Sequence, residues 1–173
     1  MRLFIAINFN EEAKTHIIEV QNKLRQLDER ANFTAKENLH LTLAFLGELP
    51  AERIAAIKSA MRETEFSPME LVFDHVGAFS RDGYDTCWIG LRKNSALLQM
   101  QNSLSIHLSQ AGFPLEKRRF TPHLTIARRA VLREPLQNSR LLPSPFPAQI
   151  KAINLMESSR IQGKLCYTEL FAR

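Results

Sequence analysis

Two copies of the short pattern His-x-Thr stand out as residues that could do chemistry: His40 with Thr42, and His123 with Thr125. In a β-strand, residues two apart share a face, so each copy presents an imidazole beside a hydroxyl. Two imidazoles and two hydroxyls suit a tetrahedral oxyanion such as a phosphodiester. A histidine pKa of about 6.5 lets one ring act as base and the other as acid near neutral pH. The pattern therefore predicts acid/base catalysis at a phosphodiester.

The sequence lacks the motifs typical of metal sites, nucleotide-cofactor sites and serine hydrolases. A single His-x-Thr is better interpreted as a core histidine that hydrogen-bonds to the neighbouring Thr or to a backbone group. Two copies in matching contexts are much less likely to occur by accident. A zinc site needs clustered His, Cys or carboxylate ligands, whereas this pattern supplies one ligand per strand and no nearby acid. The chain contains no G-x-x-x-x-G-K-[ST], G-x-G-x-x-G or G-x-S-x-G. We therefore expect neither a metal nor a nucleotide cofactor.

Strands and amphipathic helices, each with one apolar face, should position these residues. An apolar helical stripe follows Asn10, Pro50 opens a second helix, and a third helix is expected over residues 95–111. The segments with strand patterns are residues 2–7, 38–46, 70–79, 86–91, 120–127, 148–157 and 164–171, and the Pro-rich stretch 135–147 reads as a long connection. The fold class is predicted to be α+β.

The two halves of the chain contain the same order of strand, helix and motif. A strand at Leu3–Ile7, a striped helix and the motif of His40 are matched by Cys87–Leu91, a striped helix and the motif of His123. Two such units predict a bilobal molecule whose lobes are related by a pseudo-twofold axis, with like elements meeting in a central cleft. Residues 1–173 are expected to form this single bilobal domain.

The positive charge is concentrated in one segment. Of the net charge of +5, residues 117–140 hold seven basic side chains and one acidic one, which leaves the rest of the chain at −1. Such a local excess favours an anionic partner, and nucleic acid is the first candidate. A solvated basic surface is the plainer alternative for the segment taken alone.

Composition places further bounds. At 173 residues and 45% hydrophobic content the chain can build a globular core. Its two cysteines favour a reduced, cytoplasmic setting over a disulfide framework. The apolar run at Leu3–Ile7 is far shorter than the roughly 18 residues of a membrane span. We expect no membrane association and no obligate protein partner.

With these residues in view, the chain resembles the bacterial RNA 2′,3′-cyclic phosphodiesterases, also called 2′-5′ RNA ligases, of the two-histidine phosphoesterase superfamily. The resemblance spans nearly the whole chain and rests on Leu3–Ile7, Asn38–Gly47, Pro122–Arg128, and Tyr167 followed by Leu170. It implies two lobes that each carry an antiparallel sheet. It also implies metal-independent opening of 2′,3′-cyclic phosphate RNA ends to 2′-phosphates, and ATP-independent, reversible 2′-5′ joining.

The same resemblance implies roles for the motif residues. His40 and His123 would be the acid/base pair, and Thr42 and Thr125 would donate hydrogen bonds to the phosphate. We assign His40 to protonate the departing O3′ and His123 to activate water, although the internal symmetry leaves this order open.

Two further positions lie five residues beyond the histidines. The resemblance implies that Phe45 stacks on a base and that Arg128 contacts phosphate. Strand alternation places an odd offset on the opposite face unless the strand bends or bulges. Arg118 and Arg119 could follow the RNA backbone, or could be plain surface charges.

Alternatives remain at this point. The substrate could be a 2′-5′ oligonucleotide or a small cyclic nucleotide, or the chain could be a non-catalytic RNA-binding module whose histidines only hold phosphate. The other histidines, His16, His75 and His107, are expected to have structural or surface roles.

Overall fold

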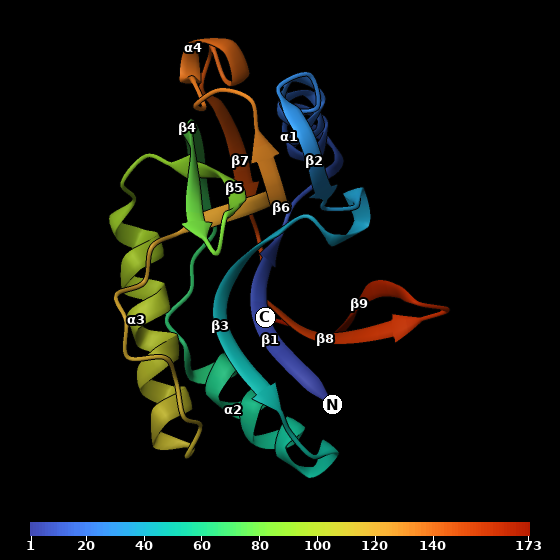
Figure 1. The fold of residues 1–173 in the computed structure, drawn as a ribbon. Coiled ribbons are helices and arrows are strands. Elements are labelled where there is room, and N and C mark those ends of the chain that lie inside the picture. The colour runs from blue at the N-terminus through green and yellow to red at the C-terminus, as the bar shows by residue number, and fades with distance from the viewer.

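The computed structural model describes the backbone of residues 1–173 and the side chains of all residues except 28 and 29. Helices pack on an antiparallel sheet in an α+β fold, as predicted (Figure 1). The strands are β1 (Arg2–Asn8), β2 (Asp28–Phe33), β3 (His40–Glu48), β4 (Met69–Arg81), β5 (Tyr84–Leu91), β6 (His123–Leu132), β7 (Phe146–Ile150), β8 (Asn154–Ile161) and β9 (Lys164–Ala172). The helices are α1 (Glu11–Leu24), α2 (Ile54–Glu63), α3 (Ser95–Gln110) and α4 (Asn138–Leu141), with short 3₁₀ turns at Lys36–Asn38 and Ala51–Arg53.

The two motif strands meet at the centre of the sheet. The strand order is β7-β4-β5-β6-β3-β1-β8-β9, with β2 paired to β6. β3 and β6 run antiparallel and pair through Leu41 and Leu124. Four strands therefore extend from this junction on each side, and the whole sheet curls (Figure 1). The motif strands lie side by side, as expected, and through this pairing the sheets of the two lobes join as half-sheets of one curled sheet.

The internal repeat is visible in this topology. β1, α1 and β3 form one strand–helix–strand unit, and β5, α3 and β6 form the other. Ile5 pairs with the residue four positions after His40, and Cys87 pairs with the residue four positions after His123. The structure thus aligns Ile5 with Cys87, two residues away from the alignment that the sequence suggested.

Each long helix begins at a side-chain cap. The Oδ1 atoms of Asn10 and Asn94 accept hydrogen bonds from the backbone N–H groups of Ala13 and Leu97, at 2.9 and 2.8 Å. α1 packs near β6 and β7, α2 packs against α3, and Gln101 on α3 bonds to the backbone of β3 (Figure 1). The helix of each unit therefore lies against the other unit's motif strand. The helices α1, α2 and α3 cover one face of the sheet. We call the opposite face the open face.

Some elements differ from the expectations. The segment 148–157, expected as one strand, is divided between β7 and β8, and the Pro-rich stretch 135–147 contains α4 and the start of β7. β2 was not foreseen. It pairs only with β6, and its polar sequence acquires strand structure from that pairing rather than from an apolar pattern of its own. The apolar pattern that follows Asn10 predicts a helix extending to Leu27. Leu27 is buried, but α1 ends at Leu24.

Within the described part of the chain, no helix combines the length and apolar character needed to cross a membrane.

Candidate active site

The same backbone device orients both motif histidines. The Nδ1 atom of His40 lies 2.7 Å from the carbonyl oxygen of Asn38, and Nδ1 of His123 lies 2.7 Å from that of Thr121. A carbonyl oxygen can only accept a hydrogen bond, so each Nδ1 carries the hydrogen and donates it. In the neutral ring, Nε2 is then the unprotonated nitrogen. Each ring is held in the tautomer whose Nε2 can take up or release a proton.

The sheet register brings the two motifs together. Because Leu41 pairs with Leu124 on antiparallel strands, His40 lies beside Thr125, and Thr42 lies beside His123. Thr42 Oγ1 is also 3.1 Å from Nε2 of His40. All four side chains are at least partly exposed, whereas the leucines between them are buried beneath the helices. The imidazoles and hydroxyls therefore share the open face at the junction of the half-sheets.

Bulges decide the direction of Phe45 and Arg128. The β1–β3 register skips Leu43, and the β5–β6 register skips Ile126, each three residues after a motif histidine. One extra residue reverses the alternation beyond it, so an odd offset from the histidine returns to the histidine's face. Phe45 is accordingly 41% exposed, and Arg128 is exposed as well. The structure thus brings both residues to the open face.

Two glutamines hold these bulges from the helix side. Nε2 of Gln21, on α1, donates to the carbonyl oxygens of Ile126 and Thr34, both at 2.9 Å. Nε2 of Gln101, on α3, donates to the carbonyl oxygen of Leu43 at 3.3 Å. The carbonyl oxygen of Ile126 also accepts a hydrogen bond from the backbone N–H of Thr34 at 3.0 Å, so the glutamine adds a second donor there. The pseudo-twofold relation thus extends to the side chains that support the motif strands, a pairing that sequence reasoning did not find.

Replacing Gln21 by Leu tests this support. We expect the free energy of unfolding to fall by about 1–3 kcal/mol, because the carbonyl group of Thr34 loses this donor and that of Ile126 keeps only the backbone N–H of Thr34. Gln99 is an exposed glutamine on α3, so Gln99→Leu is the matched control and should change stability little. Urea denaturation of the three proteins measures the difference. Equal stability of Gln21→Leu and the unmodified protein would contradict a structural role for these bonds.

Aromatic rings enclose each histidine. The ring centroids of Phe4 and Tyr167 lie 5.0 and 5.1 Å from that of His40. On the other half-sheet, Phe79 and Trp88 lie 5.1 and 6.2 Å from His123. The structure thus places Trp88 and Tyr167 against the histidines. Phe4 and Phe79 gave no signal, because only tertiary pairing brings their strands beside the motifs.

This environment lowers the pKa of both histidines. Burial is the main cause for each, and it disfavours the charged ring. The backbone hydrogen bonds act in the opposite direction and raise the pKa values, but they do not outweigh burial. The positive charge of Arg128 lowers both pKa values further, and His40 also feels the charge of His123. The two rings and Arg128 therefore form one electrostatic unit.

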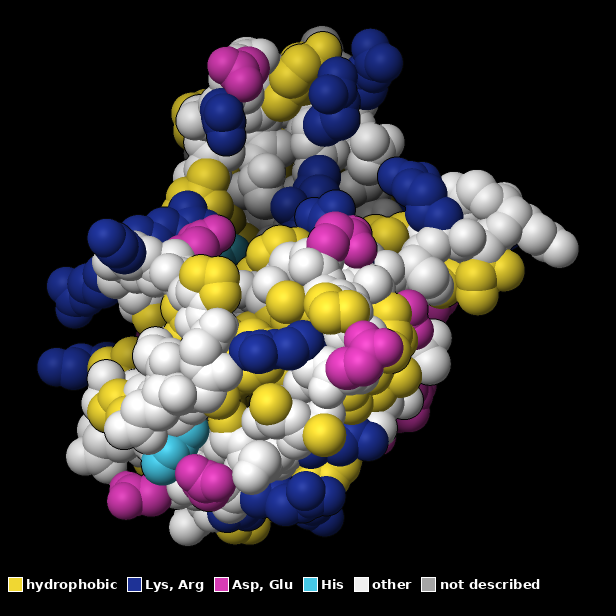
Figure 2. Space-filling view, turned by 90° about the horizontal axis from the view of Figure 1, so that it is seen from below, with side chains coloured by type: hydrophobic (Ala, Val, Ile, Leu, Met, Phe, Trp, Pro, Cys, Tyr) yellow, Lys and Arg dark blue, Asp and Glu magenta, His cyan; other side chains and the backbone are white. Residues whose placement is uncertain are grey.

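The basic segment contributes to this site unequally. Arg128 acts on both histidines, and Arg118 acts on His123. The Arg118 side chain is 82% exposed and forms an ion pair with Glu116 at 2.7 Å, while Arg119 is exposed. Lys and Arg side chains line the left edge and upper part of the molecular face in Figure 2. The positive charge seen in the sequence thus includes groups whose field reaches the histidines.

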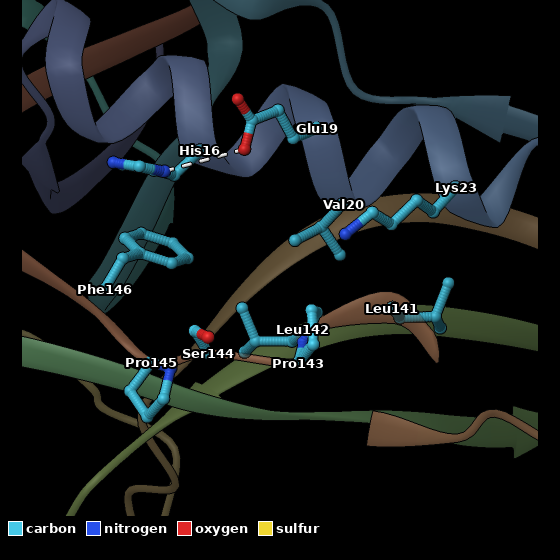
Figure 3. A pocket seen from close by; sticks show the side chains of 10 residues that line it. All are labelled: His16, Glu19, Val20, Lys23, Leu141, Leu142, Pro143, Ser144, Pro145 and Phe146. Atoms are coloured by element: carbon cyan, nitrogen blue, oxygen red, sulfur yellow. Dashed lines mark ion pairs between the residues drawn. The ribbon is translucent and has the colours of Figure 1, made fainter. Parts of the chain in front are cut away.

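A pocket of about 250 Å³ lies elsewhere, between α1 and residues 141–146 (Figure 3). His16 stacks on Phe146 at its rim, with the ring centroids 5.1 Å apart, and pairs with Glu19 at 3.6 Å. Neither motif histidine lines it. Among the side chains that the structure describes, no group of three or more His, Cys, Asp or Glu residues is placed to hold a metal ion.

Comparison with known proteins agrees with this arrangement. Residues 10–162 match the family model described as the 2′-5′ RNA ligase superfamily, a range that contains both His-x-Thr motifs and both bulges. The chain belongs to the 2′-5′ RNA ligase superfamily. It is 30% identical to the RNA 2′,3′-cyclic phosphodiesterase of Escherichia coli K12, over 98% of this chain and 93% of that protein.

Other members of the superfamily are similarly related. The RNA 2′,3′-cyclic phosphodiesterase of Thermotoga maritima is 35% identical over 74% of this chain and 70% of its own length. The crystal structure of E. coli LigT complexed with 3′-AMP matches with a TM-score of 0.82 at 30% identity, covering 99% of this chain and 96% of that one. The sequence resemblance to the superfamily is therefore confirmed.

Proposed function

We propose that this enzyme hydrolyses the 2′,3′-cyclic phosphate at RNA ends to a 2′-phosphate, and that it also catalyses ATP-independent, reversible 2′-5′ joining. The observation that carries the proposal is the pair of Nδ1-anchored imidazoles on adjacent strands of one face, with Arg128 acting on both. Membership of the superfamily and relatives named RNA 2′,3′-cyclic phosphodiesterase support the same reaction.

The proposed mechanism uses one imidazole as the base and the other as the acid. Nε2 of His123 removes a proton from water as the water oxygen attacks phosphorus, and Nε2 of His40 donates a proton to the departing O3′. The product keeps its phosphate on O2′. Each ring is held by a carbonyl group, so the imidazoles are already oriented when the substrate binds.

The remaining site residues would bind the substrate. Thr42 and Thr125 would donate hydrogen bonds to the non-bridging oxygens, and Arg128 would offset the charge that develops on them. Phe45 would stack on the base at the cyclic end. Support for these roles comes from their common location on the open face, where strand alternation places Thr42 and Thr125, and the two bulges place Phe45 and Arg128. None of these steps requires a metal ion.

RNA ends are the proposed partner, and the cytoplasm is the proposed compartment. The basic segment 117–140 supports the first, and the low cysteine content supports the second. No obligate protein partner is proposed.

A substrate panel tests the proposed function. The enzyme should open an oligoribonucleotide that ends in a 2′,3′-cyclic phosphate, with 2′-phosphate as the product and undiminished turnover in EDTA. The panel also includes a 2′-5′ oligoadenylate and a 3′,5′-cyclic nucleotide. A strong preference for either would favour the alternative phosphodiesterase activities. RNA binding that weakens with salt, without turnover of any substrate, would favour a non-catalytic binding module.

The pH profile of kcat/KM should be bell-shaped and centred below pH 6.5. Catalysis needs one neutral and one protonated ring, and burial lowers both histidine pKa values below their ordinary value of about 6.5. The cyclic phosphodiester itself does not titrate in this range. Removing the cation in Arg128→Ala should raise both pKa values and move the profile to higher pH. Steady-state rates between pH 4.5 and 9 measure this, and a profile centred well above 6.5 would contradict it.

A further inference from the structure

A third histidine lies in line with His123 across the sheet. On neighbouring antiparallel strands, His123 is paired with Gly90, and Gly90 is paired with His75. Directly opposed residues in an antiparallel pair project from the same face. His75 therefore lies on the open face, two strands away from His123.

The residue between the two histidines has no side chain, and the ring of His75 covers it. A Cβ added at Gly90 would lie 2.2 Å from Nε2 of His75 and 2.4 Å from its Cε1. Any side chain at this position would displace the imidazole. The ring of His75 thus extends over Gly90, along the row that leads to His123.

A carboxylate holds this ring. Oδ1 of Asp74 lies 2.6 Å from Nδ1 of His75, and its Oδ2 lies 3.6 Å from Nε of Arg92. The carboxylate accepts the Nδ1 hydrogen, so Nε2 of the neutral ring is a hydrogen-bond acceptor. The side chain of His75 remains 42% exposed. It is therefore an oriented imidazole that a ligand can reach.

Aromatic rings connect His75 to the motif histidine. Trp88 meets His75 edge-on with the centroids 5.7 Å apart, and Phe79 contacts both Trp88 and His123 at 5.2 and 5.1 Å. Phe79 is 45% exposed. We name these four residues (His75, Phe79, Trp88 and Gly90) the acceptor strip. The strip joins a polar acceptor to an aromatic surface beside His123.

The other half-sheet carries different side chains at the equivalent positions. Asn8 pairs with His40 as Gly90 pairs with His123, so Asn8 occupies the corresponding position. Its Nδ2 donates to Oε2 of Glu169 at 3.5 Å, and Nδ2 of Asn154 donates to the same oxygen at 2.7 Å. Side chains that bond to one another therefore fill this row. The two half-sheets therefore differ at this row: an exposed imidazole lies on the His123 side, whereas hydrogen-bonded amide and carboxylate side chains lie on the His40 side.

We propose that the acceptor strip binds the nucleoside that carries the 5′-hydroxyl in 2′-5′ joining, and that leaves when a 2′-5′ linkage is cleaved. This inference rests on the proposed function, in which His123 activates the nucleophile and Phe45 holds the cyclic end. In joining, O5′ forms a bond to phosphorus while the P–O3′ bond breaks. The proton of the 5′-hydroxyl passes to His123, and His40 supplies a proton to O3′.

The chemistry of the strip indicates which parts of the nucleoside each residue would contact. Nε2 of neutral His75 can accept a hydrogen bond from a sugar hydroxyl, whereas Trp88 and Phe79 offer surface to the base. Water needs neither contact when it acts as the nucleophile. His75 should therefore discriminate between substrates with and without a second nucleoside.

The test compares two substrates of the same enzyme. One is a 2′-5′-linked diadenosine monophosphate, whose leaving adenosine would occupy the acceptor strip, and the other is adenosine 2′,3′-cyclic phosphate, which has no second nucleoside. In His75→Ala, we expect the ratio of kcat/KM for the dinucleotide to kcat/KM for the cyclic phosphate to fall about tenfold, the scale of one lost hydrogen bond and its packing. Asp74→Asn should lower the same ratio less, because it changes only the partner of Nδ1.

His16→Ala is the matched control, because His16 lies on α1 away from the open face, and it should leave the ratio unchanged. An unchanged ratio in His75→Ala, or an equal loss on both substrates, would overturn the inference. So would a wild-type enzyme that hydrolyses the cyclic phosphate but never cleaves the dinucleotide. Failure of the wild-type enzyme on both substrates would overturn the proposed function itself.

Discussion

His40→Ala and His123→Ala should each lower kcat for a 2′,3′-cyclic phosphate oligonucleotide by about 10²- to 10⁴-fold, the range typical of a lost general acid or base. The expectation rests on the equivalent anchoring of both rings, with Nδ1 bonded to a carbonyl group at 2.7 Å in each case. Because the proposed mechanism uses both rings in the same transition state, neither should substitute for the other. Single-turnover kinetics at saturating substrate measure the chemical step directly.

His16→Ala serves as the control for both variants, because His16 is bonded to a surface carboxylate on α1 and lies outside the site. Circular dichroism should show the same fold for all three variants. If either motif variant kept even a third of the wild-type rate, the two-histidine mechanism would be wrong. If only His40→Ala were inactive, the assignment of His123 as base would have to be abandoned.

Arg128→Ala should lower kcat/KM for the same substrate by about 10- to 100-fold. A hydrogen bond to a charged group contributes about 1.5–3 kcal/mol, and the proposed role of Arg128 is to give one to the phosphate. The bulge at Ile126 directs Arg128 to the open face, where its charge acts on both motif histidines. Part of the loss should appear in KM, because the charge also attracts the bound substrate.

The neighbouring arginine provides the control for this variant. Arg129 is exposed on the same strand, but its guanidinium lies 4.4 Å from the centre of the Tyr84 ring. Arg129→Ala should therefore change kcat/KM little. Equal losses from the two substitutions would indicate a general effect of positive charge rather than a specific phosphate contact. Raising the salt concentration should weaken such a general effect more than a direct contact.

Much of the site could be predicted because its signals are local. Strand alternation placed His40 beside Thr42 and His123 beside Thr125, and the spacing of apolar residues predicted α1 and α3. The repeated order of strand, helix and motif indicated two equivalent units. These inferences depend only on the periods of helices and strands, which the chain carries in every short window.

Other features depend on pairs of residues far apart in the sequence. Local alternation cannot show that β3 skips Leu43 or that β6 skips Ile126, because a bulge is a mismatch between two strands. The direction of Phe45 and Arg128 therefore became clear only from the register. The same holds for the roles of Gln21 and Gln101, whose partners lie 105 and 58 residues away.

The sequence by itself determined the α+β class, the paired motifs and the basic segment, because composition and short-range periodicity specify them. Tertiary structure alone decided which strands meet at the centre, which rings enclose the histidines, and that His75 reaches over Gly90 on the side of His123. The physical reason is that hydrogen-bond register between distant strands fixes which side chains share a face, and that register is set by the packing of the whole sheet.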